Sequence, residues 1–189
     1  MSLTALILTT GKTLDEYEQE IKQFIKDNNP VTIGVHNMAG RFVPDYHLFV
    51  SKKRYKEYGK KVHPASKLVL TTRMGGTLSL ENKYPSSHGS IKIDGDKIVA
   101  EGASGGVVGA AYAIMLGADT VYMVGQDGYS DGAKHHYKEK ENNWERLMEH
   151  ESATKMILRD LNKYAKVRII TPTVYKEFYD EHILFDAHG

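Results

Sequence analysis

The chain has 189 residues, of which 41% are hydrophobic, and it carries 25 basic and 24 acidic side chains but no cysteine. This length and composition predict a single domain, residues 1–189, with a buried core, and the near-zero net charge argues against a large basic surface for nucleic acid. The lack of cysteine excludes disulfides, thiolate metal sites and cysteine nucleophiles, and it is typical of a reducing cytoplasm.

The N-terminal segment MSLTALILTTGK has neither the basic start nor the long apolar core of a signal peptide. No stretch approaches the roughly 20 apolar residues that a membrane helix needs. We therefore expect a soluble, cytoplasmic protein that binds a small molecule, with no membrane and no nucleic acid as partner. Met1 to Leu3 are typical of a vector remnant and the chain stops abruptly at Gly189, so we also expect a domain excised from a longer protein.

The first 90 residues alternate predicted strands and helices. The aliphatic run Leu3–Leu8 is broken at Gly11, which is typical of a buried parallel strand that ends in a turn. A helix should follow, because Thr13 and Glu16 form a capping-box pattern and apolar residues recur at helical spacing as far as Pro30. Three more strands are predicted at residues 31–35, 45–50 and 67–71, and residues 72–90 are expected to form a long loop.

The second half continues this alternation. Residues 90–100 predict a hairpin that turns around Gly95. The stretch GASGGVVGAAYAIMLGADTVYMVGQDGYS predicts a helix of very small residues, a turn at Gly117 and a buried strand at 120–124. A long charged amphipathic helix at 139–164, a last strand at 167–170 and a short helix from Val174 complete the chain. The pattern favours the α/β class: a Rossmann-like three-layer sandwich with a mostly parallel sheet.

Gly11, Lys12 and Thr13 lie where the first strand meets the first helix, so backbone amides, the helix dipole and a lysine should point at one spot. This arrangement favours phosphate binding at the carboxyl edge of the sheet. A P-loop is excluded, because Leu6 stands where that motif needs glycine. The alternative is a plain capped helix with a surface lysine.

A second anion site is expected where Ser104 and Gly105 open the small-residue helix, although the glycines would equally allow close packing of this helix on the sheet. Gln126 and Asp127 follow the next strand at the same edge, and Asp127 is suited to bind a ribose hydroxyl or a divalent metal such as Mg²⁺. Capping of the next turn is its alternative. Asn37, at the end of the second strand, is also expected to face the ligand.

His135 and His136 precede the long helix, and either is suited to general acid–base catalysis or to neutralising a leaving phosphate. Adjacent histidines point to different sides of most backbones, so we do not expect both to bind one metal. A solvated polar loop explains the pair equally well. Lys52, Lys53 and Arg54 are expected at an exposed helix start, with phosphate contact as the alternative. A core stripe is expected of Tyr175, Phe178 and Tyr179, with an aromatic platform for base stacking as the alternative.

These features resemble the Rossmann-like 6-hydroxymethylpterin diphosphokinase (MptE-like) family, with a remoter similarity to bacterial sialyltransferases that use a CMP-activated sugar. The resemblance spans most of the chain and is strongest over residues 103–129. The sequence also resembles domains found in the C-terminal part of proteins that carry a hydroxy-oxo-acid aldolase barrel. The residues that carry the family resemblance are Pro44, Asp45 and Tyr46; Gly125, Gln126 and Asp127; and Ile170, Thr171 and Pro172.

The resemblance implies a domain that binds a nucleotide or a nucleotide-sugar, as part of a phosphoryl or glycosyl transferase. The aldolase-associated likeness implies the alternative, a non-catalytic domain that senses or steers a ligand for a fused or associated aldolase-type enzyme. A dehydrogenase that uses NAD is not favoured, because no complete GxGxxG motif follows a strand.

Overall fold

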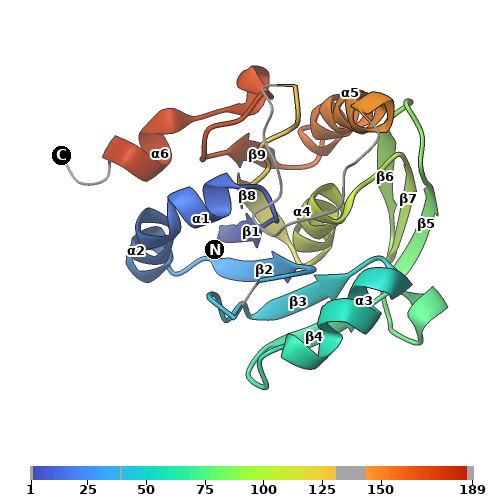
Figure 1. Ribbon diagram of the computed structural model, residues 1–189, viewed down its shortest axis with the longest axis horizontal. Coiled ribbons are helices and arrows are strands. Elements are labelled where there is room, and N and C mark those ends of the chain that lie inside the picture. Colours follow the sequence, from blue (N-terminus) through green and yellow to red (C-terminus); the bar gives the residue numbers. More distant parts are fainter. Residues whose placement is uncertain (1, 39, 131–143, 187–189) are drawn as a thin grey trace.

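The computed structural model describes residues 2–38, 40–130 and 144–186. Its centre is a six-stranded sheet in which every neighbouring pair is parallel, in the order β4-β3-β2-β1-β8-β9 (Figure 1). The expected α/β class with a Rossmann-like parallel sheet is therefore confirmed. The strands of this sheet are β1 (Leu3–Leu8), β2 (Val31–Val35), β3 (Tyr46–Phe49), β4 (Lys67–Leu70), β8 (Ala118–Val124) and β9 (Lys166–Ile169).

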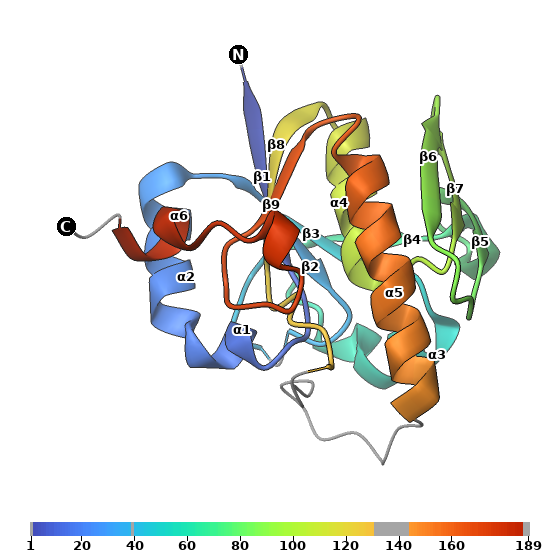
Figure 2. The same cartoon turned by 90° about the horizontal axis from the view of Figure 1, so that it is seen from above.

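Helices cover both faces of this sheet, which explains why its strands are aliphatic rather than alternating (Figure 2). In β1, Leu6 and Leu8 belong to a core cluster on one face, while Ala5 and Ile7 belong to the cluster on the other. The first cluster lies under α1 (Thr13–Glu16), α2 (Glu18–Asn28) and α6 (Glu181–Phe185), and the second lies under α4 (Gly105–Met115) and α5 (Trp144–Leu161).

A second sheet forms a fourth layer outside α4 and α5 (Figure 2). It contains β5 (Ser79–Lys83), β6 (Ser90–Asp94) and β7 (Lys97–Glu101) in the order β5-β7-β6. The expected hairpin is confirmed as β6 and β7, with Gly95 at a positive φ in its turn. The expected loop over 72–90 is wrong in part, because it contains the 3₁₀ turn η2 (Thr72–Met74) and β5, whose pairing with β7 is parallel.

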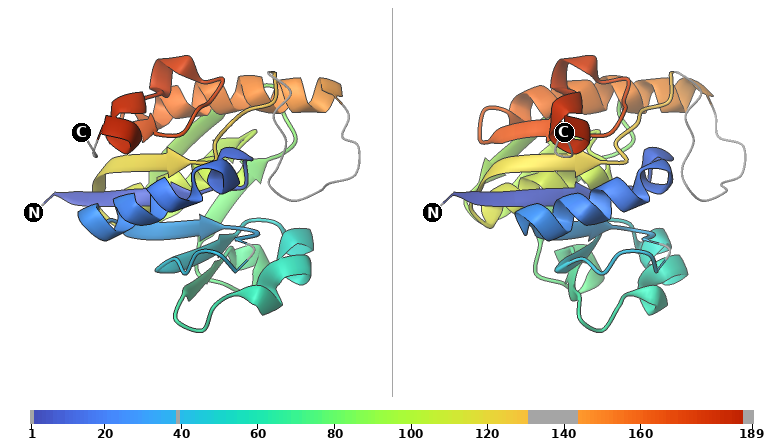
Figure 3. Two further views of the ribbon diagram at one scale, coloured as in Figure 1. Left: turned by 60° about the vertical axis from the view of Figure 1, so that its left-hand side comes forward. Right: turned by 90° about the vertical axis from the view of Figure 1, so that its left-hand side faces the viewer.

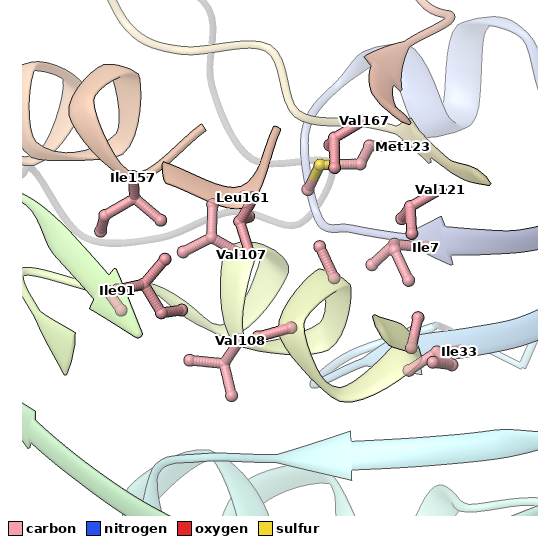
Figure 4. Close-up of a cluster of buried hydrophobic side chains, with 14 of the residues drawn as sticks. Ile7, Ile33, Ile91, Val107, Val108, Val121, Met123, Ile157, Leu161 and Val167 are labelled. Atoms are coloured by element: carbon pink, nitrogen blue, oxygen red, sulfur yellow. The ribbon is translucent and has the colours of Figure 1, made fainter. Parts of the chain in front are cut away.

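Helix α4 is buried between the two sheets, and its small side chains allow it to fit into this space (Figure 4). Val107 and Val108 are fully buried in the larger core cluster, together with Ile7 from β1 and Ile157 from α5. A Cβ on Gly109 would lie 3.1 Å from Ile7, so this glycine lets the helix approach the sheet. Close packing therefore accounts for the glycine pattern in the middle of this helix.

Two predicted helices differ in detail. The first is divided at Tyr17 into α1 and α2, and the N-cap of α1 is Lys12, without a side-chain cap. The expected capping box of Thr13 and Glu16 is therefore wrong. Helix α5 ends at Leu161. The remaining helical segments are short: α3 (Lys52–Tyr58), η1 (Gly59–Lys61) and η3 (Lys176–Phe178). Across the described ranges, every helix is too short or too polar to cross a bilayer.

Candidate functional site

A cavity of about 760 Å³ opens at the carboxyl edge of the parallel sheet. The ends of β1, β2, β3, β4 and β8 contribute to its lining, as do the first turn of α4 and the segment from β5 to Tyr84. The chain runs outward from β1 on one side and through β8 on the other, so the cavity lies at the point where the strand order reverses. Open α/β sheets bind ligands at this kind of position.

The first turn is held by the protein's own carboxylate, where we expected a phosphate. The Thr13 backbone N–H donates to an Asp127 carboxylate oxygen at 2.9 Å, and the Thr13 hydroxyl donates to the other oxygen. Gly11 lines the cavity, but its N–H donates to the Gly125 carbonyl at 2.8 Å. The Lys12 ammonium lies 2.7 Å from Glu16, and neither Lys12 nor Thr13 lines the cavity. This geometry is that of the capped-helix alternative.

The segment that follows β8 is tied down by two further threonines. The Thr171 hydroxyl accepts from the Gly125 N–H at 3.0 Å, and the Thr173 hydroxyl donates to the Gln126 carbonyl at 2.7 Å. Asp127 is only 5% exposed and Gln126 only 8%, yet both line the cavity. These bonds fix the backbone of Gly125 and Gln126, and the Gln126 side chain lies against Gly106 in the first turn of α4, where an added Cβ would come within 2.4 Å of its Oε1.

The first turn of α4 opens into the cavity. Ser104 is the N-cap residue but its side chain makes no capping bond, and Ser104, Gly105 and Gly106 all line the cavity. Asn82 from β5 holds the preceding backbone in place, since its amide donates to the Ala103 carbonyl at 2.7 Å and accepts from the Ala103 N–H at 3.2 Å. The amides at the start of a helix have no intrahelical acceptor, so this turn is suited to an anion.

Four cationic side chains line the same cavity: Lys53 and Arg54 from α3, Arg73 from η2 and Arg146 from α5. Arg54 lies 3.2 Å from Glu57. Within the described ranges, Lys53 and Arg73 make no ion pair, and Asp127 is the one carboxylate in the lining. Four cations against one carboxylate give the lining a net positive charge, even when Glu57 is counted against Arg54.

Two tyrosines and a histidine form another part of the lining. His150 on α5 makes edge-to-face contacts with Tyr84, at a ring-centroid distance of 6.1 Å, and with Tyr129, at 5.7 Å. The Arg146 guanidinium lies 6.0 Å from the centre of the Tyr84 ring. Glu151 accepts from the Tyr129 N–H at 2.7 Å and so fixes the loop after β8 against α5.

Two polar atoms at this side of the cavity are buried without a hydrogen bond of normal geometry to any described residue: Nδ1 of His150 and the hydroxyl of Tyr175. The Tyr175 hydroxyl lies near Thr154 and Gln126, and burial raises the pKa of this tyrosine. Burial, and secondarily Arg146, lowers the pKa of His150 to about 4, against the opposite effect of Glu151. The imidazole is therefore neutral near pH 7.

The other expected site residues are not gathered here. Asn37 lines a separate cavity of about 60 Å³, beside His36 and His47. His135 and His136 lie outside the described residues. Among those described, no group of three histidine, aspartate or glutamate side chains is arranged to hold a metal ion. The cavity does gather Gly11, Ser104, Gly105, Gln126 and Asp127, as expected from the sheet-edge rule.

Sequence reasoning missed Asn82, Tyr84, Arg73, Arg146 and His150 as lining residues. Arg146 and His150 are four residues apart and therefore share one face of α5, but the same spacing recurs throughout a charged helix. Comparisons of the chain with protein-family models, with curated proteins and with solved structures gave no match.

Proposed function

We propose that this domain binds a phosphorylated small molecule in the 760 Å³ cavity, and that the ligand is a nucleotide or a nucleotide-sugar. The observation that carries this proposal is the convergence of Lys53, Arg54, Arg73 and Arg146 on one cavity whose single described carboxylate is already bound to Thr13. An anionic ligand neutralises these charges, and the cavity volume falls within the range of small-molecule sites.

Transfer of a phosphoryl or glycosyl group from the nucleotide is the reaction class that this site supports best. Such reactions depend on positive charge placed against the leaving phosphate, which Arg73, Lys53 and the open N-terminus of α4 would supply. The resemblance to the MptE-like family and to sialyltransferases supports the same class. A role of His135 or His136 in proton transfer, and of Mg²⁺ as cofactor, stays part of this proposal.

One observation favours a second candidate, a domain that binds the ligand without converting it. Asp127, the carboxylate best placed to bind metal or ribose, is buried and bonded to Thr13, so its position is explained by the fold alone. Under this proposal the domain senses or steers a phosphorylated ligand for an attached enzyme.

Thermal unfolding in the presence of CMP, UMP, AMP, GMP, ATP and NAD tests the proposed binding. A ligand that binds only the folded state raises its stability, by about 2.7 kcal/mol at 100 times Kd. Lys53→Ala should reduce the shift and Lys52→Ala should not, because Lys52 has the same charge and lies next to Lys53 but outside the lining. No shift with any ligand at millimolar concentration would refute the proposal.

Product analysis separates the two candidates. Incubation of the protein with the nucleoside triphosphate or nucleotide-sugar of the base that stabilises it, with and without Mg²⁺, should release a nucleoside phosphate, together with phosphate, pyrophosphate or free sugar, if the domain is a transferase that can use water as acceptor. The same incubation is repeated with a panel of sugar and alcohol acceptors. If the ligand stabilises the protein but stays intact in every case, the domain binds without catalysis.

A further inference from the structure

One part of the cavity lining is aromatic and consists of Tyr84, Tyr129 and His150. Tyr84 is 46% exposed although it lies at the cavity and contacts His150, and Tyr129 and His150 are half-buried. Exposure of a single tyrosine is ordinary, since Tyr164 is similarly exposed away from the cavity. What distinguishes this part of the lining is that three rings from three different segments meet at the cavity: Tyr84, Tyr129 and the neutral imidazole of His150.

The cationic part of the lining lies on the other side of α4. Lys53 and Arg54 come from α3 and Arg73 from η2, whereas His150 comes from α5. Helices α3 and α5 lie on opposite sides of α4 in Figure 1 and again in Figure 3. The first turn of α4 therefore lies between a cationic side and an aromatic side of one cavity. Arg146 is the exception to this division, because it lies over the Tyr84 ring.

We propose that the cavity holds its ligand in one orientation, with a planar heteroaromatic ring against Tyr84, Tyr129 and His150 and with phosphate toward Lys53, Arg54 and Arg73. This inference rests on the proposed function and extends it to the class and direction of the ligand. Aromatic side chains and guanidinium planes bind nucleobases by stacking, in a manner that tolerates several bases. The ring side therefore contributes affinity for nucleotides over inorganic phosphates.

Pyrophosphate and the nucleoside monophosphates AMP, CMP, GMP and UMP are probes that separate the two sides. We expect at least one monophosphate to bind the wild type more tightly than pyrophosphate does. Tyr84→Ala should weaken binding of that monophosphate about tenfold, the scale of one lost stacking contact, and leave pyrophosphate affinity unchanged. Arg73→Ala should weaken both probes. Isothermal titration calorimetry measures each affinity.

His150→Leu is a second ring variant. It keeps the bulk of the side chain and removes a buried nitrogen that has no hydrogen-bond partner among the described residues, so the fold should tolerate it. Like Tyr84→Ala, this variant should weaken binding of the monophosphate and leave the pyrophosphate affinity unchanged. Tyr164→Ala is the control, because Tyr164 is similarly exposed, at 43%, and does not line the cavity.

Three results would overturn the inference: equal loss of pyrophosphate and monophosphate binding in the ring variants, unchanged monophosphate binding in both, or a wild type that binds pyrophosphate at least as tightly as every monophosphate. If the wild type binds none of the probes, the proposed function itself fails, and the orientation with it.

Discussion

At the residue scale, the Asp127 carboxylate acts as a ligand that the protein provides for itself. It accepts from the backbone and hydroxyl of Thr13, and the same hydroxyl lies 3.0 Å from Thr171. One buried side chain thus connects the turn after β1, the turn after β8 and the segment after β9. The N-terminus of α1 has its negative charge in place before any ligand arrives.

Asp127→Asn should lower the free energy of unfolding by about 1–3 kcal/mol, because an amide replaces a charged acceptor and turns one of its two hydrogen-bonding atoms into a donor. Thr13→Val, which removes only the hydroxyl, should cost about 1 kcal/mol, and the double variant should cost less than the sum. Urea unfolding measures all three. An unchanged transition in Asp127→Asn would show that the carboxylate is not a structural cap.

His150 makes stability depend on pH. Its pKa is about 4 in the folded protein and 6.5 in an ordinary environment, so the unfolded chain binds more protons between these values. Stability should therefore be complete above about pH 6.5 and fall as the pH drops toward 4, by at most about 3 kcal/mol from this group. Chemical denaturation at a series of pH values measures the slope.

His150→Leu should flatten that slope without abolishing it, because burial also lowers the pKa of His47 and gives a contribution of the same sign. A variant with the full wild-type slope between pH 4 and 6.5 would mean that another group carries the dependence.

At the scale of elements, the successful predictions concern segments whose surroundings in the fold are reflected in their own sequence pattern. Helix α4 is apolar on every side because it lies between two sheets, and its run of glycine and alanine already indicates this environment. Strand β5 has no such pattern. Only Leu80 of its five residues is buried, so its sequence is polar and resembles a loop until β7 pairs with it.

Contact between the small sheet and α5 depends on the absence of a side chain at Gly89, just before β6. A Cβ there would lie 1.9 Å from the Ala153 carbonyl oxygen in the helix backbone. Gly89→Ala should therefore destabilise the protein by about 2 kcal/mol or more, since backbone must move. Gly95→Ala should cost only about 1 kcal/mol, because that glycine has a positive φ but open space around it. Equal effects in urea unfolding would contradict this reading.

At the scale of the whole molecule, part of the candidate site follows from topology and part does not. Parallel strands bring their carboxyl ends to one edge, which is sufficient to predict that Gly11 and Gln126 lie together. Ser104 joins them because α4 begins at this edge and runs back to the start of β8. Arg73 and His150 reach the cavity from a 3₁₀ turn and from a long helix. Their position depends on how these segments pack on the sheet, and one sequence contains no local signal for that packing.

The central position of β1 also has a consequence for synthesis on the ribosome. Strand β2 follows β1 closely, but the partner on the other edge arrives late, since Thr9 bonds to Val124, 115 residues further along the chain. A nascent chain therefore exposes one edge of its first strand until β8 has emerged, and an exposed edge can pair with a neighbouring chain. The ligand cannot shorten this interval, because the cavity needs residues from Thr9 to Tyr175. Any protection of this edge before β8 is made must therefore come from something other than the ligand.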